Sequence, residues 1–324
     1  MSFLAIIISV GLFYFLGSAK LFHHDKWFYR WLDLFSYQQP FQALHVLTVL
    51  GLPCLALLLI YQQAGTFLWG LPELALSIIV IMYSIGRGEY KGVLSKYAKQ
   101  WRKETISYEF AEQALQRLQQ SSHYQCITDG ESDVKAEDLY GLHIQIREQL
   151  YYCSLQRVFA VLFWLAVLGP VAAFAYRLLV LYLRYFCQLS QAGLQAQDNT
   201  EDALPGQNAE KMTFAYQLLY FLEWPASRLQ GLCYALVGNF SQVITLWLNT
   251  VTDFKLSISY YLSSLANATL DFQTQWGSAI YTSSRSEEEL AKKAADEIFM
   301  SIALYQRSLV FSLLGIALFE IFVF

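Results

Sequence analysis

The sequence predicts an all-α fold: a polytopic helical membrane protein with amphipathic helical loops and a kinked or re-entrant segment at residues 159–183. Of the 324 residues, 56% are hydrophobic and 15% are charged, whereas about a quarter of a typical soluble domain is charged. The charges gather in a few polar stretches between long apolar runs. Runs of roughly 20 apolar residues match the hydrocarbon thickness of a bilayer, so several membrane-spanning helices are expected.

Composition also narrows the classes of function. The net charge of −4 provides no basic field that would attract nucleic acid. The five cysteines form no C-x-x-C pair, and the neighbouring His23 and His24 would point to different sides of a helix, so we expect no metal site. The chain also has no G-x-x-x-x-G-K-[ST] phosphate loop. No cofactor is therefore predicted, and the lipid bilayer is the partner that composition indicates.

The N-terminal membrane region, residues 1–86, is predicted to hold three spans. These are residues 1–17, 41–61 and 67–85. A short uncharged turn is predicted at residues 62–66, so the second and third spans would form a hairpin. The aromatic-rich stretch Lys20–Pro40 suits an amphipathic helix that lies in the membrane interface.

Residues 87–157 are predicted to form a cytoplasmic helical region. Lysine and arginine crowd its first part, Arg87–Lys103, where Glu89 is the single acidic residue, and the positive-inside rule places such a stretch in the cytoplasm. Ile106–Gln119 carries apolar residues at helical spacing and is expected to be an amphipathic helix. A polar loop at 122–137 separates it from a second helix that starts near Leu139 and runs toward the membrane.

The C-terminal region, residues 158–324, begins with the segment that decides the topology. Leu168-Gly169-Pro170 falls near the middle of residues 159–183, and proline removes a helical hydrogen bond. The segment is either one kinked span or a hairpin that enters and leaves on the same side. A single span would place residues 184–302 outside, and a hairpin would place them inside.

The rest of this region is predicted to be helical loop followed by one last span. Residues 190–210 have the composition of a flexible linker. Packed helices are expected in the helical loop 211–302, including one over 254–269 that Asp253 would cap. The span at 309–324 ends the sequence.

Arg228 is the first candidate for a functional residue. It lies between apolar stretches, and a guanidinium buried near a membrane is costly unless it pairs with a carboxylate or binds an anion. The structural alternative is an ion pair with Glu223 or Asp253. Arg177 follows an apolar run and is expected to extend its side chain to the membrane interface.

Short motifs in a fixed order resemble the AmpE family over nearly the whole chain. They are Phe159-Ala-Val-Leu-Phe-Trp164, Leu168-Gly-Pro170 with Tyr176-Arg177, Glu223-Trp-Pro-Ala-Ser-Arg-Leu229, Tyr234-Ala-Leu-Val-Gly238, Thr252-Asp-Phe254 and Tyr305-Gln-Arg-Ser-Leu309. The resemblance implies a multi-pass protein of the bacterial inner membrane that modulates β-lactamase induction and cell-wall, or muropeptide, signalling. It also implies a muropeptide ligand or a peptidoglycan amidase of the AmpD type as partner.

The AmpE family is similar in turn to the CobD/CbiB membrane enzymes of cobalamin biosynthesis. This implies an alternative function, a divergent enzyme of the adenosylcobinamide-phosphate synthase type. Those enzymes carry Asn and Asp where this chain has Val180 and Leu183, so we expect no catalytic residues. A tentative ligand site would comprise Arg228, Trp224, Glu223, Asp253 and Arg177.

Overall fold

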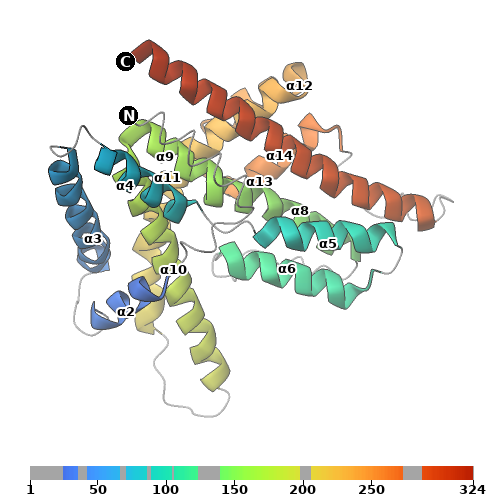
Figure 1. Cartoon of the computed structure of the whole chain (residues 1–324). Coiled ribbons are helices and arrows are strands. Elements are labelled where there is room, and N and C mark those ends of the chain that lie inside the picture. Colours follow the sequence, from blue (N-terminus) through green and yellow to red (C-terminus); the bar gives the residue numbers. More distant parts are fainter. Residues whose placement is uncertain are drawn as a thin grey trace. The chain divides into compact units, whose positions relative to one another are not determined.

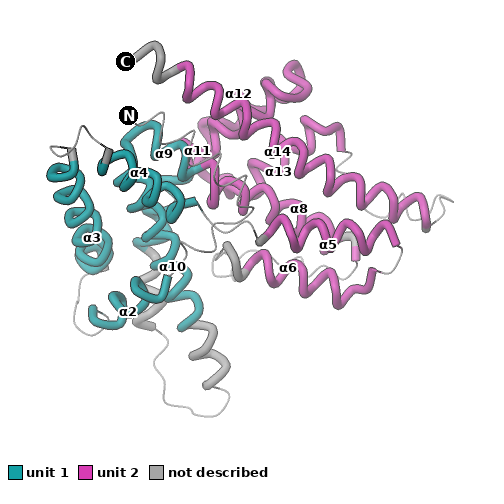
Figure 2. Tube along the Cα trace, in the orientation of Figure 1, with its two compact units in different colours: residues 1–87, 160–223 teal, residues 88–159, 224–324 magenta. Residues whose placement is uncertain are grey.

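The computed structural model describes residues 25–35, 42–65, 71–85, 89–103, 106–122, 139–197, 206–272 and 287–323. Every element in this part of the chain is a helix (Figure 1), which confirms the predicted all-α class. The helices form two compact units (Figure 2). Unit 1 comprises residues 1–87 and 160–223, and unit 2 comprises residues 88–159 and 224–324.

Four helices in the described part are long and apolar enough to cross a membrane. They are Ala43–Ala64, Gly141–Leu168, Pro170–Leu189 and Glu288–Leu318. A shorter apolar helix covers Pro72–Ser84. The chain is therefore a multi-pass helical membrane protein, as predicted.

The boundaries of the N-terminal spans differ from those predicted. Helix α3 covers Gln42–Gly65, so the predicted turn at 62–66 is wrong for its first four residues. The cause is that Gln62, Gln63 and Ala64 are good helix formers, and nothing interrupts the helix before glycine. Helix α4 covers Leu71–Ser84. The first predicted span, residues 1–17, lies outside the described residues, as do residues 66–70 and most of the predicted loop at 122–137.

In unit 1, helix α10 (Pro170–Gln197) packs against four others: α2 (Lys26–Phe35), α3, α4 and α9 (Ala160–Leu168). Pro53 lies inside α3, so the carbonyl of Val49 loses the N–H that would bond it within the helix. The indole N–H of Trp31, on α2, donates to this oxygen at 3.2 Å. A side chain from a neighbouring helix thus satisfies a carbonyl for which the core of a bilayer would supply no water.

Residues 159–183 are divided by Gly169, which ends α9 and has a φ of +85°. Glycine adopts this left-handed conformation without steric cost, and Pro170 then starts α10 as the first helical residue, where its missing N–H is harmless. Helices α9 and α10 pack against each other, so the chain turns back at this point. The predicted break is confirmed, and the two sides of it form a helical hairpin.

The flexible linker predicted at residues 190–210 is wrong at both of its ends, and residues 198–205 between them lie outside the described residues. Helix α10 continues to Gln197, and α11 already begins at Gly206 and ends at Val237. The Gln- and Ala-rich residues after Ser190 favour helix despite their polar composition. Pro225 lies inside α11.

Within the described residues, unit 2 comprises residues 224–237 of α11 together with seven other elements. They are α5 (Glu89–Arg102), α6 (Tyr108–Ser122), α8 (Leu139–Ser154), the π-helical turn η3 (Leu155–Phe159), α12 (Phe240–Thr250), α13 (Ile258–Thr269) and α14 (Glu287–Val323). The predicted amphipathic helix is α6, which buries Ala114, Leu115 and Leu118. Helix α8 packs against α6, α13 and α14, and it carries much of the polar core of the unit.

Candidate functional site

The structure divides the five predicted site residues between the two units. Trp224, Arg228 and Asp253 belong to unit 2, whereas Arg177 and Glu223 belong to unit 1. Within unit 2, Arg228 lies at the centre of a cluster that includes both Trp224 and Asp253. We call Arg228, Trp224 and Tyr261, with the carbonyls of Val251 and Asp253, the Arg228 cluster.

Two main-chain carbonyls hold the guanidinium of Arg228. Its Nε–H donates to the oxygen of Val251 at 3.1 Å, and Nη2 donates to the oxygen of Asp253 at 2.7 Å. Both acceptors lie where the chain leaves α12. The indole N–H of Trp247 donates in turn to the carbonyl of Arg228 at 2.9 Å. The arginine therefore joins α11 to the end of α12.

Aromatic rings surround the same cation. The Cζ of Arg228 lies 3.7 Å from the ring centroid of Tyr261 and 5.4 Å from that of Trp224, distances at which cation–π attraction operates. Phe254 stacks on Trp224, with ring centroids 4.6 Å apart and planes at 13°. Only 4% of Arg228 is exposed, so the charge is stabilised by rings and carbonyls in place of water.

Three hydrogen-bond donors of the Arg228 cluster have no acceptor among the described residues. They are Nη1 of Arg228, Nε1 of Trp224 and the hydroxyl of Tyr261, and all three atoms are buried. Burial raises the pKa of the Tyr261 phenol to about 12, although the nearby Arg228 cation opposes the shift. The phenol is therefore protonated at neutral pH. Buried donors are nearly always paired in proteins, so a positive charge with three spare donors fits the binding of an anionic oxygen group.

Asp253 has a different role from the one predicted. It does not cap α13, which begins at Ile258 and takes Ser257 as its N-cap, with the Ser257 hydroxyl accepting from the N–H of Tyr260. The Oδ1 of Asp253 instead accepts from the N–H of Lys255 at 2.8 Å, a turn within the connecting segment. None of the ion pairs between described residues joins Arg228 to a carboxylate, so the predicted pairing with Asp253 is replaced by a contact with its main-chain oxygen.

Arg177 and Glu223 each contact a residue of unit 1. Arg177 lies 3.6 Å from the carboxylate of Asp25, and both side chains are largely buried. The predicted extension of Arg177 to the interface is wrong, because this counter-ion compensates the charge inside the unit. Glu223 accepts a hydrogen bond of 2.8 Å from the hydroxyl of Tyr176.

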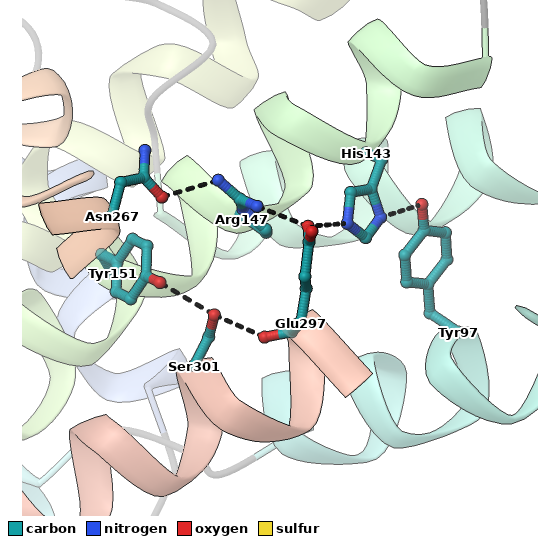
Figure 3. A network of polar contacts seen from close by, with 7 residues as sticks. All are labelled: Tyr97, His143, Arg147, Tyr151, Asn267, Glu297 and Ser301. Atoms are coloured by element: carbon teal, nitrogen blue, oxygen red, sulfur yellow. Dashed lines mark hydrogen bonds and ion pairs between the residues drawn. The ribbon is translucent and has the colours of Figure 1, made fainter. Parts of the chain in front are cut away.

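A buried polar network in unit 2 escaped the sequence-based prediction (Figure 3). Oε2 of Glu297 accepts from Nη1 of Arg147 at 2.6 Å and lies 3.3 Å from Nε2 of His143. Arg147 also donates to the side-chain oxygen of Asn267 at 2.6 Å. The hydroxyl of Tyr97 lies 3.1 Å from Nδ1 of His143. A neutral His143 with its proton on Nε2 satisfies both of its contacts.

The Glu297 network links four helices, because its members come from α5, α8, α13 and α14. It continues along α14, where the Ser301 hydroxyl donates to the carbonyl of Glu297 and accepts from Tyr151. His143, Arg147 and Tyr151 follow one another at intervals of four residues, and Glu297 and Ser301 do so too. This four-residue spacing, which places side chains on one face of a helix, was the sequence pattern that could have indicated the network. It could not indicate which residues pair, because Arg147 and Glu297 lie 150 positions apart in sequence.

Comparison with known proteins finds one family. The model of that family, described as regulatory signalling modulator protein AmpE, matches residues 2–308. Comparisons with curated proteins and with solved structures find no match. The family match spans nearly the whole chain and confirms the family resemblance that the sequence indicated. The chain therefore belongs to the AmpE family of regulatory signalling modulators.

Proposed function

We propose that this protein is a non-enzymatic regulator of the bacterial inner membrane that modulates β-lactamase induction and cell-wall signalling by binding an anionic effector at the Arg228 cluster. Membership of the AmpE family supports the regulatory role, and the four candidate spans support the membrane location. The identity of the pathway rests on the family resemblance, and the identity of the site rests on its geometry.

The observation that carries the proposed site is the set of spare donors around Arg228. Two of the guanidinium nitrogens bond to carbonyls, and Nη1 remains without an acceptor, as do Nε1 of Trp224 and the hydroxyl of Tyr261, whose rings lie 5.4 Å and 3.7 Å from Cζ of Arg228. A carboxylate oxygen would supply the missing acceptor and the missing counter-charge at once. Muropeptides carry carboxylates and so provide the proposed ligand. A carboxylate on an amidase of the AmpD type would meet the same donors.

No observation favours the alternative enzyme of the CobD/CbiB type. The resemblance aligns Val180 and Leu183 with the Asn and Asp of those enzymes, and both are buried apolar residues of α10. Neither can accept a proton or bind a metal ion, so the proposal does not include that reaction.

A complementation experiment tests the proposed function. The gene is deleted and then restored with the wild-type chain, with Arg228→Met or with Arg117→Met, and β-lactamase activity and muropeptide pools are measured after exposure to a β-lactam. Arg117 is an exposed residue of α6 and serves as the matched control. We expect the deletion and Arg228→Met to alter induction in the same direction, and Arg117→Met to behave as wild type.

An unchanged β-lactam response and unchanged muropeptide pools in the deletion strain would refute the regulatory role. Altered induction in the deletion strain, with full restoration by well-expressed Arg228→Met, would leave the role standing and refute the site. The two parts of the proposal are therefore tested separately.

A further inference from the structure

Unit 1 contains an apolar cavity of about 320 Å³ whose lining comes from helices α3, α9, α10 and α11. It lies wholly in unit 1 and has no residue in common with the Arg228 cluster. No charged side chain lines it. We call it the unit 1 groove. Its volume is at the lower end of the range for ligand pockets, about 300–1,000 Å³.

Small residues create the space in the groove. Gly51 lines it from α3, and Ala172 and Ala175 line it from α10. A Cβ added at Gly51 would meet no atom within 4 Å. Gly51 is exposed, so the absence of a side chain at this position leaves open space at the outer edge of the groove.

The two polar aromatic residues of the lining use their polar atoms elsewhere. The indole N–H of Trp164 donates to the carbonyl of Leu222 at 3.2 Å, and the hydroxyl of Tyr176 donates to Glu223 at 2.8 Å. These groups are thus not available to a ligand, and the rings present apolar surface. A polar or charged ligand would lose its hydration without gaining hydrogen bonds, so the groove selects hydrocarbon.

The position of the groove identifies the source of that hydrocarbon. Leu47 and Leu168 line the groove and are 60% and 66% exposed, so the groove is continuous with the outer surface of α3 and α9. Both helices belong to candidate spans, and α3 exposes a further row of leucines that suits contact with lipid tails: Leu44, Leu52, Leu55, Leu58 and Leu59. In a bilayer, this surface meets acyl chains.

We propose that the unit 1 groove is a lipid-binding site that holds one hydrocarbon chain of a membrane lipid against Gly51, between α3 and α10. The head of the lipid stays outside, because the groove offers it no partner. The site is independent of the effector proposed for Arg228, and it adds a lipid ligand to the protein in the membrane.

Photolabelling tests the site directly. The full-length protein is reconstituted into vesicles of phosphatidylethanolamine and phosphatidylglycerol that contain a trace of phospholipid with a diazirine within its acyl chain. After illumination, mass spectrometry maps the adducts. Wild type is compared with Gly51→Leu, which fills the groove, and with Gly315→Leu. Gly315 also lies in a candidate span, and a Cβ added there would meet no atom within 4 Å, so it is the matched control.

We expect adducts concentrated on the peptides of Cys54 and Trp164, their loss in Gly51→Leu and their persistence in Gly315→Leu. Ala172→Phe fills the groove from the opposite wall and should cause the same loss, which guards against a folding defect particular to residue 51. Equal labelling of the groove peptides in the filled variants and wild type would overturn the proposal. So would adducts spread evenly over the exposed leucines of α3, which indicate surrounding lipid only.

Discussion

The indole N–H of Trp31 donates to the carbonyl oxygen of Val49, the oxygen that Pro53 deprives of its helical partner. A proline inside a membrane-spanning helix is tolerated when another group satisfies the freed carbonyl. Here the replacement comes from a separate helix, so one hydrogen bond both completes α3 and attaches α2 to it.

Trp31→Phe should therefore destabilise the protein by about 1–2 kcal/mol, because it leaves a buried carbonyl unpaired. The measurement is the thermal unfolding midpoint of the purified protein in detergent. In a Pro53→Ala background, the alanine supplies the missing N–H, and the cost of the same substitution should fall. Equal costs in the two backgrounds would show that the indole contributes packing alone.

Glu297 and its neighbour Asp296 provide an internal comparison of buried and exposed charge. Glu297→Gln leaves Arg147 buried without its counter-ion, and we expect a loss of about 3–5 kcal/mol in unfolding free energy. Asp296 pairs with Arg102 at the surface, where both side chains are more than half exposed. Asp296→Asn should cost at most about 1 kcal/mol.

Unfolding of both variants in detergent by urea measures the difference. Similar costs for the two substitutions would contradict the view that the Glu297 network holds α8, α13 and α14 together. A further check is the double replacement Arg147→Met with Glu297→Leu. It should be less destabilising than Glu297→Gln alone, since it leaves no unpaired charge in the core.

Gly231 allows α11 to approach α13 closely. A Cβ at this position would lie 2.6 Å from Cδ1 of Leu265 and 2.7 Å from the hydroxyl of Tyr261. Gly231→Ala should therefore displace the Tyr261 ring from Arg228 and cost about 1–3 kcal/mol in stability. Gly92→Ala meets no neighbouring atom and should stabilise α5 by about 0.5–1 kcal/mol. Thermal unfolding of the two variants measures both changes in stability. A Gly231→Ala variant that is more stable than wild type would contradict the close approach of α11 to α13.

Much of the fold follows from local pattern in the sequence. The apolar run around α3, the amphipathic spacing of α6 and the Leu168-Gly169-Pro170 break each depend on residues close together in the chain. The polar composition after Ser190 misled the prediction, because glutamine and alanine favour helix as readily as they populate linkers. The error at Asp253 is similar: two capping residues, Asp253 and Ser257, lie four positions apart, and tertiary contacts decide between them.

The site was predicted less completely than the fold. The sequence singled out Arg228 because a cation lies between apolar stretches, and Trp224 because it belongs to the same family-like motif. It contained no local signal that Tyr261 stacks on the same guanidinium. Contacts of this kind depend on which helices pack together. The pairing of Arg147 with Glu297 could not be predicted for the same reason. The helical spacing indicated which side chains share a helix face, but not which residues on other helices they contact.

Lysine in place of Arg228 separates charge from geometry. Arg228→Lys keeps the positive charge but loses the planar guanidinium that bonds to two carbonyls and stacks on Tyr261. We therefore expect Arg228→Lys to restore induction of β-lactamase in the deletion strain only in part, and Arg228→Met not at all. Full restoration by lysine would show that the positive charge alone is sufficient.

Direct binding of a muropeptide tests the central claim, that the Arg228 cluster receives an anionic effector. The full-length protein in detergent is titrated with a purified muropeptide that has free carboxylates, and the unfolding midpoint is recorded. At a ligand concentration about 100 times the dissociation constant, binding should stabilise wild type by about 2.7 kcal/mol. The account predicts no stabilisation of Arg228→Met and none by the carboxyl-amidated muropeptide. Equal stabilisation of wild type and Arg228→Met by the free carboxylate form would contradict it.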